Sequence, residues 1–281
     1  MIISVASGKG GTGKTTVAVN LALSLGVAQL LDCDVEAPNA HLLLNPQITE
    51  TYPVHMPIPR IDEERCDHCG KCSEFCHYHA LVVTKDMVLT FPELCHGCGG
   101  CSLVCPRKAI TEVHREIGVV KRGKVDGVDL VYGELGVGEP MATPLIREVR
   151  KRASTDKIVI VDAPPGTSCP VVAATHGTDF CLLVTEPTPF GLNNLHLMVG
   201  VLREIDIPLG VVVNFHGIGD TGIHDYCEKA GIPILLHIPF DKRIAELYSR
   251  GVPFIAEMPI WRKKFQRLLG SIEELVVTRS N

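Results

Sequence analysis

The segment from Ser7 to Thr16, which reads Ser-Gly-Lys-Gly-Gly-Thr-Gly-Lys-Thr-Thr, constrains the fold of this chain more than any other. It follows a short apolar run, Ile2 to Ala6, and precedes a stretch in which Val17, Leu21 and Leu25 repeat at helical spacing. A glycine-rich turn between a buried strand and a helix directs backbone N–H groups and the helix dipole toward phosphate oxygens. The segment therefore predicts a phosphate-binding loop, with a merely flexible glycine loop as the alternative.

Individual side chains in this loop have specific expected roles. Lys14 has the place of the lysine that contacts the β- and γ-phosphates, and the Thr15 hydroxyl has the place of a Mg²⁺ ligand. The expected cofactors are therefore ATP and Mg²⁺. The residues expected to contact the nucleotide are Gly8, Gly10, Gly11, Thr12, Gly13, Lys14, Thr15 and Thr16.

One lysine, Lys9, directly follows the first glycine and is not required by the minimal motif. With this extra lysine the loop resembles the deviant Walker A motif of the MinD/ParA/nitrogenase iron protein class of ATPases. The resemblance implies ATP hydrolysis, slow without a partner, in a homodimer that forms on ATP binding. It also implies that Lys9 and Lys14 are catalytic and that Lys9 reaches the nucleotide of the other subunit. A solvated surface lysine is the alternative for Lys9.

Acidic residues follow two later apolar runs and fit the same resemblance. The run from Ala28 to Leu31 leads into a segment that contains Asp32 and Asp34, and the run from Lys157 to Val161 ends at Asp162, before Pro-Pro-Gly-Thr. Ligands bind at the carboxyl ends of strands in doubly wound sheets. The resemblance implies that Asp34 orients the attacking water and that Asp32 and Asp162 support the Mg²⁺. Helix-capping or turn-forming aspartates are the alternative.

Eight of the twelve cysteines form two runs with the same spacing, C-x2-C-x2-C-x3-C. The first run is Cys66, Cys69, Cys72 and Cys76, and the second is Cys95, Cys98, Cys101 and Cys105. This is the bacterial ferredoxin arrangement for two 4Fe-4S clusters, in which the fourth cysteine of each run ligates the other cluster. One cluster is therefore assigned to Cys66, Cys69, Cys72 and Cys105, and the other to Cys95, Cys98, Cys101 and Cys76. Zinc is the competing metal, because paired C-x2-C elements also bind zinc.

The composition changes abruptly before the cysteine runs, where Pro53, Pro57 and Pro59 are expected to interrupt regular structure. We therefore predict an inserted two-cluster ferredoxin-like domain at residues 60–118. Residues 1–59 and 119–281 are predicted to form one discontinuous P-loop ATPase domain. The predicted fold class is α/β, a doubly wound, mostly parallel P-loop NTPase sheet with an inserted α+β bacterial-ferredoxin-like domain.

Two residues depart from the family patterns. His77 stands where ferredoxins usually have proline, and it either donates to a cluster sulfur or faces solvent. Cys169 follows Asp162 at the spacing of a cluster cysteine in the nitrogenase iron protein, but Glu139 occupies the place of the second such cysteine. Cys169 is therefore interpreted as a structural or redox-sensitive thiol, with cluster ligation as the alternative.

The last third of the chain alternates strand and helix patterns and ends in an amphipathic segment. Asn214 and Pro239, at the ends of two of these strands, resemble the adenine-binding positions of this ATPase class, with a turn residue as the alternative for Asn214. Trp261, Phe265 and Leu268 open a helical repeat near the C-terminus. We expect this helix to pack on the sheet; membrane binding, as by the C-terminal helix of MinD, is the alternative.

Composition limits the environment and the partners. The net charge of −5 gives no electrostatic footprint for nucleic acid, and no apolar run is long enough to span a bilayer. The first apolar run leads into the glycine loop and does not resemble a secretory leader. We therefore expect a cytoplasmic protein with no nucleic-acid partner and no membrane association. Cysteines in that compartment indicate metal binding rather than disulfides.

Together these motifs predict an ATP-hydrolysing iron–sulfur protein. Its nucleotide-dependent dimer cycle is predicted to gate electron transfer or metallocluster assembly on a redox or cluster-accepting partner protein. The alternative is a MinD/ParA-like positioning or cell-division ATPase in which the clusters are structural or redox-sensing.

Overall fold

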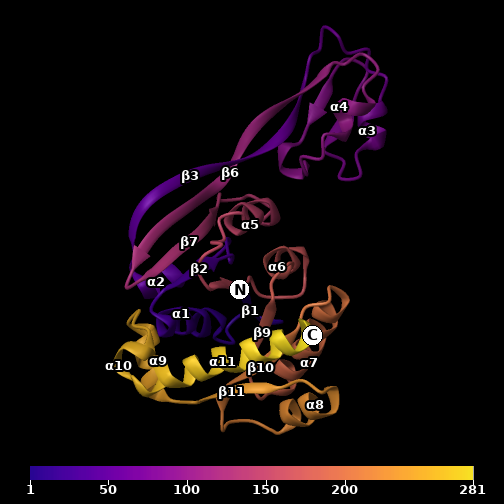
Figure 1. Ribbon diagram of the computed structural model, residues 1–281. Helices are drawn as coiled ribbons and strands as arrows, with labels where there is room; N and C mark the ends of the chain where they lie inside the picture. The colour runs from indigo at the N-terminus through magenta and orange to yellow at the C-terminus, as the bar shows by residue number, and fades with distance from the viewer. Residues whose placement is uncertain (281) are drawn as a thin grey trace. The chain divides into compact units, whose positions relative to one another are not determined.

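The computed structural model describes residues 1–280 and divides them into two compact units (Figure 1). The larger unit contains Met1–Thr51, Val120–Glu134 and the chain from Ile146 onward. The smaller unit contains Tyr52–Val119 and Leu135–Leu145. The chain therefore passes from the larger unit into the smaller one twice and returns each time.

Strands and helices alternate in the larger unit. Its elements before the first passage are β1 (Ile2–Ala6), α1 (Lys14–Leu25), β2 (Ala28–Asp32) and α2 (Ala40–Leu44). Those after the second return are β8 (Val159–Asp162), α6 (Cys169–Thr175), β9 (Phe180–Thr185), α7 (Pro189–Glu204), β10 (Leu209–His216), α8 (Gly222–Ala230), β11 (Ile234–Pro239), α9 (Lys242–Ser249), α10 (Phe254–Glu257) and α11 (Ile260–Ser280). The elements whose residues belong to both units are β3 (Gln47–Ile61), β6 (Ile110–Val125), β7 (Val128–Leu135) and α5 (Thr143–Arg150).

A nine-stranded sheet has the order β11-β10-β9-β1-β8-β2-β7-β6-β3. Every neighbouring pair from β11 to β7 is parallel, and β1 lies between β8 and β9. Val5 of β1 is in register with Asp162 of β8, and Asp32 of β2 is also in register with Asp162. The glycine loop and the two aspartates therefore meet at the carboxyl edge of the sheet. This arrangement confirms the predicted α/β fold with a mostly parallel sheet.

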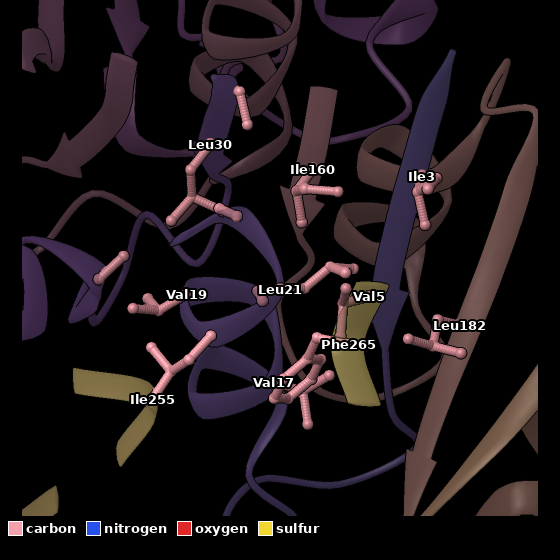
Figure 2. Close-up of a cluster of buried hydrophobic side chains, with 14 of the residues drawn as sticks. Ile3, Val5, Val17, Val19, Leu21, Leu30, Ile160, Leu182, Ile255 and Phe265 are labelled. Atoms are coloured by element: carbon pink, nitrogen blue, oxygen red, sulfur yellow. The ribbon is translucent and has the colours of Figure 1, made fainter. Parts of the chain in front are cut away.

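One face of this sheet packs against α1 and α11 (Figure 2). Apolar side chains of the central strands, such as Val5 and Ile160, contact the buried face of α1, which includes Val17 and Leu21. The helix α11 contributes Phe265, which is fully buried in the same core. The C-terminal helix therefore packs on the core, as expected. Among the described residues, no helix is both long and apolar enough to cross a membrane.

The three prolines Pro53, Pro57 and Pro59 lie inside β3. The prediction that they interrupt regular structure was therefore wrong. β3 is the last strand in the sheet order, and a strand at an edge needs fewer of its N–H groups for ladder hydrogen bonds, so it tolerates proline. In the smaller unit β3 runs antiparallel to β6. The Thr111 hydroxyl donates to the carbonyl oxygen of Arg60, and the N–H of Asp62 donates to the carbonyl oxygen of Ala109.

The smaller unit contains a structural repeat. Its remaining elements are α3 (Lys71–Phe75), β4 (Leu81–Val83), β5 (Val88–Thr90), a 3₁₀ turn (Pro92–Leu94) and α4 (Gly100–Val104). The strands β4 and β5 form an antiparallel hairpin. Each short helix follows a glycine with positive φ, Gly70 before α3 and Gly99 before α4. Positive φ values recur at His79 and Lys108, three residues after the last cysteine of each run. The two cysteine runs therefore fold in the same way.

Candidate functional site

The glycine-rich loop connects the carboxyl end of β1 to the first turn of α1. Gly11 and Gly13 have φ values of 81° and 91°, which L side chains rarely adopt. A Cβ atom at Gly13 would also lie 2.5 Å from Nδ2 of Asn214. Gly13 immediately precedes α1, so Lys14 and Thr15 open the helix. The position of these two side chains therefore depends on glycine at residue 13.

A cavity of about 350 Å³ opens over this loop. Its volume lies in the range of small-molecule binding sites. The loop residues that line it are Gly10, Gly11, Gly13, Lys14, Thr15 and Thr16. Lining residues from other segments include Asp34, Asn39, Asn214, Phe215, Pro239, Phe240 and Tyr248. Two other predicted contact residues, Gly8 and Thr12, line a small cavity beside α7 instead, together with Lys9.

Thr15, which lines this cavity, is in direct contact with the buried side chain of Asp162. The Thr15 hydroxyl donates to Oδ2 of Asp162 at 2.5 Å, whereas Oδ1 of Asp162 is buried without a partner among the described residues. Burial, reinforced by the negative charge of Asp32, raises the pKa of Asp162 well above its usual value. A buried carboxylate oxygen without a partner beside a hydroxyl oxygen is the donor set that Mg²⁺ prefers. The residues present therefore fit a magnesium ion.

Asp32 and Asp34 differ in their surroundings. Both carboxylate oxygens of Asp32 accept backbone N–H groups, from Asp34 at 3.0 Å and from Asn39 and Ala40 at 3.1 and 3.0 Å. Burial raises the pKa of Asp32 to about 6 although these hydrogen bonds lower it. Asp34 is half-buried in the cavity wall, and burial raises its pKa while the charge of Lys14 opposes that rise. Asp32 therefore holds the segment that presents Asp34 to the cavity.

Lys9 is paired inside its own chain. Its Nζ atom lies 2.5 Å from Oε1 of Glu186 and 5.0 Å from the centre of the Phe190 ring. The same carboxylate oxygen of Glu186 accepts the Thr188 hydroxyl at 3.1 Å. Glu186 directly follows β9, which is next to β1 in the sheet. Sequence reasoning did not single out Glu186, although an acidic residue at the end of an apolar strand was the signal used for Asp32 and Asp162.

Asn214 is hydrogen-bonded to the glycine loop. Its Nδ2 group donates to the carbonyl oxygen of Thr12 at 2.8 Å, and its Oδ1 atom accepts the N–H of Phe215 at 3.0 Å. Asn214 and Pro239 both line the cavity, so their predicted contact with adenine stays a prediction. Sequence reasoning missed the aromatic residues Phe215 and Phe240, whose ring centres lie 6.2 Å apart in the wall of the same cavity.

The smaller unit brings the eight repeated cysteines together as two sets of four. One cavity is lined by Cys66, Cys69, Cys72 and Cys105. A second cavity, of about 260 Å³, is lined by Cys76, Cys95, Cys98 and Cys101. In each set, three cysteines come from one run and the fourth comes from the other. These are the two groups that the ferredoxin spacing indicates, although their ligation of iron stays a prediction.

The cysteine sets are chemically suited to bind an iron–sulfur cluster. All twelve cysteines of the chain are free thiols, so no disulfide consumes the donors. The Sγ atoms of Cys76, Cys95 and Cys105 accept backbone N–H groups at 3.4, 3.4 and 3.3 Å. Such hydrogen bonds to sulfur are a main determinant of cluster potential. Four cysteines around one cavity, with backbone N–H groups that donate to their sulfur atoms, fit a 4Fe-4S cluster.

The two residues that depart from the family patterns lie in different places. His77 lines the cavity of the second cysteine set, next to Tyr78, whose ring stacks on His96. Cys169 is exposed at the first residue of α6 and belongs to neither cysteine set. Cys169 belongs to the larger unit, whereas both cysteine sets belong to the smaller one.

The fold and the glycine loop define a P-loop nucleotide-binding protein of the α/β class. The family model described as "CobQ/CobB/MinD/ParA nucleotide binding domain" matches residues 3–254. The chain belongs to this family.

Several curated relatives match over most of their own length. An uncharacterised protein of Methanocaldococcus jannaschii is 33% identical over 98% of this chain and 96% of its own. A cytosolic Fe-S cluster assembly factor, the Nubp2 homologue of Anopheles gambiae, is 28% identical over 92% of this chain and 90% of its own. An iron–sulfur cluster carrier protein of Pyrococcus abyssi is 24% identical over 90% of this chain and 78% of its own.

Among solved structures, the septum site-determining protein MinD of Pyrococcus horikoshii, complexed with Mg-ADP, has a TM-score of 0.61. It is 20% identical in sequence, and the match covers 98% of this chain and 96% of that protein. At this identity the likeness shows a common fold.

Proposed function

We propose that this protein is an ATP-hydrolysing iron–sulfur protein whose nucleotide cycle gates electron transfer or metallocluster assembly on a partner protein. The observation that carries the proposal is the presence, in one chain, of a P-loop site and two cavities that are each lined by four cysteines. The printed names of two relatives, an iron–sulfur cluster carrier and an Fe-S cluster assembly factor, support it.

In the nucleotide site, Lys14 and the loop N–H groups bind the phosphates of ATP. Thr15 and Asp162 hold Mg²⁺, which would supply positive charge to the phosphate oxygens. Asp34 lies in the cavity wall and orients the attacking water, and Asp32 keeps the Asp34 segment in place through its backbone hydrogen bonds. Asn214 and Pro239 form the adenine side of the site.

Lys9 acts across a homodimer in this proposal. Its ammonium group is held by Glu186 within its own chain. On closure of two subunits around ATP, Lys9 leaves Glu186 for the phosphates bound by the other subunit. The attraction of a lysine to a phosphate that develops charge is larger than its attraction to a partly exposed carboxylate, because the closed site excludes water.

In the smaller unit, residues 60–118 form the ferredoxin-like domain of the proposal. One cluster is held by Cys66, Cys69, Cys72 and Cys105, and the other by Cys95, Cys98, Cys101 and Cys76. When bound, these clusters would supply one-electron redox chemistry. The segment that contains Asp34 continues through α2 directly into β3, which enters the smaller unit. A rearrangement of this segment on hydrolysis would therefore reach the smaller unit through the chain itself.

Anaerobic reconstitution with iron and sulfide tests the proposal. We expect about eight iron atoms per chain, slow ATP hydrolysis, and a dimer by light scattering with a non-hydrolysable ATP analogue but not with Mg·ADP. Lys14→Ala is the matched control, which should abolish dimer formation and leave the iron content unchanged. Uptake of zinc in place of iron, or a monomer with the ATP analogue, would contradict the proposal.

A further inference from the structure

Three histidines from separate elements of the larger unit converge outside both sites described above. His216 ends β10, His224 lies in α8, and His237 lies in β11. One ring nitrogen of each lies within 4.8 Å of the corresponding nitrogen of the other two. The ring centres of His216 and His237 are 4.4 Å apart, and those of His224 and His237 are 5.3 Å apart.

The closest pair has the spacing of two ligands of one metal ion. The Nε2 atoms of His224 and His237 lie 3.1 Å apart. Two imidazole nitrogens on a tetrahedral zinc ion, each at a Zn–N distance of 2.0–2.1 Å, are about 3.3 Å apart. The spacing of His224 and His237 is therefore close to that of two imidazole ligands on one zinc ion. His216 supplies a third nitrogen within 4.8 Å of the other two.

The protein itself provides little else for these rings to bind. Nδ1 of His224 is buried and has no hydrogen-bond partner among the described residues. No ion pair to a carboxylate is formed by any of the three histidines in the described part of the chain. The Nε2 atoms of His224 and His237 are within hydrogen-bond distance of each other, so one donates a proton to the other when no cation is bound. A shared cation would take the place of that proton.

The backbone around the cluster is fixed by the sheet. His216 is in register with Pro239, and the N–H of Phe240 donates to the carbonyl oxygen of His216 at 3.1 Å. Phe215 has a φ of 54°, a conformation that costs energy in a bulky residue. With Phe215 in this conformation, Asn214 contacts the glycine loop, and His216, two residues further along, belongs to the histidine cluster.

We propose that His216, His224 and His237 form a binding site for a divalent first-row transition metal ion of the zinc type, with water in the fourth position. Imidazole nitrogen is a preferred ligand of these ions. His216 and His237 are exposed, so the ion has access from solvent. The site uses none of the cysteines and none of the residues assigned to ATP or Mg²⁺.

A competition titration with Zn²⁺ against a chromophoric chelator tests the site in the full-length protein. The cysteine sets are first loaded with iron and sulfide, and the iron content is measured again afterwards, so that zinc bound by cysteine is recognised. We expect the wild-type protein to bind one equivalent of Zn²⁺. The variant His237→Gln should bind this equivalent at least ~100-fold more weakly, since the loss of even an outer-sphere partner costs 10–100-fold.

The matched control is His196→Gln, an exposed histidine on α7 whose ring contacts Tyr226 of α8. It should bind Zn²⁺ as tightly as the wild type. X-ray absorption at the zinc edge of the wild-type protein gives a readout that does not depend on any variant, and we expect nitrogen and oxygen ligands only. Equal zinc affinity in wild type and His237→Gln, or sulfur in the coordination shell, would overturn the proposal.

Discussion

Lys9 is held by Glu186 within its own chain, at a distance of 2.5 Å, while the neighbouring P-loop lysine, Lys14, is buried at the nucleotide cavity. The two lysines are therefore expected to have different roles, although they are only five residues apart. In the proposed function, Lys14 binds the phosphates of the nucleotide in its own subunit. Lys9 has to leave Glu186 before it can contact a phosphate of the other subunit.

Replacement of Lys9 should therefore affect hydrolysis more than binding. We expect Lys9→Ala to lower the ATP turnover rate by about 100- to 1,000-fold, the usual loss when one preorganised charge at a transition state is removed. The affinity for ATP, measured by calorimetry, should change little. Lys229→Ala on the exposed surface of α8 is the control and should hydrolyse ATP normally. A normal turnover rate in Lys9→Ala would remove the proposed role of Lys9.

The carboxylate pair Asp32 and Asp162 should make stability depend on pH. Burial raises both pKa values, to about 6 for Asp32, above the usual value near 4 in an unfolded chain. The folded state thus keeps protons that the unfolded chain releases, so stability present at low pH is lost as the pH rises through the folded-state pKa values.

In the presence of a magnesium chelator, the melting temperature of the wild type should fall relative to that of Asp162→Asn as the pH rises from about 4, near the pKa of an unfolded aspartate, through about 6, the folded-state pKa of Asp32. Asp162→Asn cannot form the negative charge that burial disfavours at residue 162, so it lacks this loss of stability. Addition of Mg²⁺ with ADP should stabilise the wild type and have little effect on Asp162→Asn. Parallel melting curves for both proteins at every pH would show that the pair does not titrate in this range.

At the scale of elements, the two short helices α3 and α4 lie inside the two cysteine runs, just before the fourth cysteine of each. The two runs fold alike, and the fourth cysteine of each lines the cavity of the other run. Loss of one cysteine should therefore affect one set and leave the other intact. We expect Cys66→Ala to lower the iron content from about eight to about four atoms per chain. Cys33→Ala, at a buried thiol outside both sets, is the control. An iron content near eight in Cys66→Ala would refute the ligand assignment.

The helix α11 should contribute strongly to the stability of the larger unit. Phe265 is fully buried and its ring lies beside Phe254 and Trp261. Truncation of such a side chain leaves a cavity and typically costs about 3–5 kcal/mol. We therefore expect Phe265→Ala to lower the free energy of unfolding by this amount in urea denaturation. Lys263→Ala, on the exposed face of the same helix, should change it by less than about 0.5 kcal/mol.

The sequence was sufficient to predict features that depend on local pattern. Asp162, predicted from its place at the end of a strand to lie near the glycine loop, contacts Thr15. The spacing of the cysteines predicted which four of them line each cavity. The sequence was insufficient where contacts depend on register between distant segments. The hydrogen bond from Asn214 to Thr12 joins residues far apart in the chain. The histidine cluster forms only because the register of β10 with β11 brings His216 and His237 together. The prolines of β3 were misinterpreted because the strand's edge position is a property of the whole sheet.

At the scale of the whole molecule, the chain order connects the two kinds of site. The segment with Asp34 leads through α2 and β3 into the smaller unit, and β6 leads back to the larger one. β7 then enters the smaller unit a second time, and α5 returns from it. The proposed function needs this connection to transmit the nucleotide state. If the clusters merely stabilised the smaller unit, a change of nucleotide would leave their electronic properties unaltered.

The most direct test is an anaerobic redox titration of the reconstituted protein, followed by EPR, without nucleotide, with Mg·ADP and with a non-hydrolysable ATP analogue. We predict that the midpoint potential or the line shape of at least one cluster shifts between Mg·ADP and the ATP analogue. Lys14→Ala, which lacks the phosphate-binding lysine, should show no shift. Identical potentials and line shapes for the wild type in all three conditions would contradict the coupling of nucleotide and clusters.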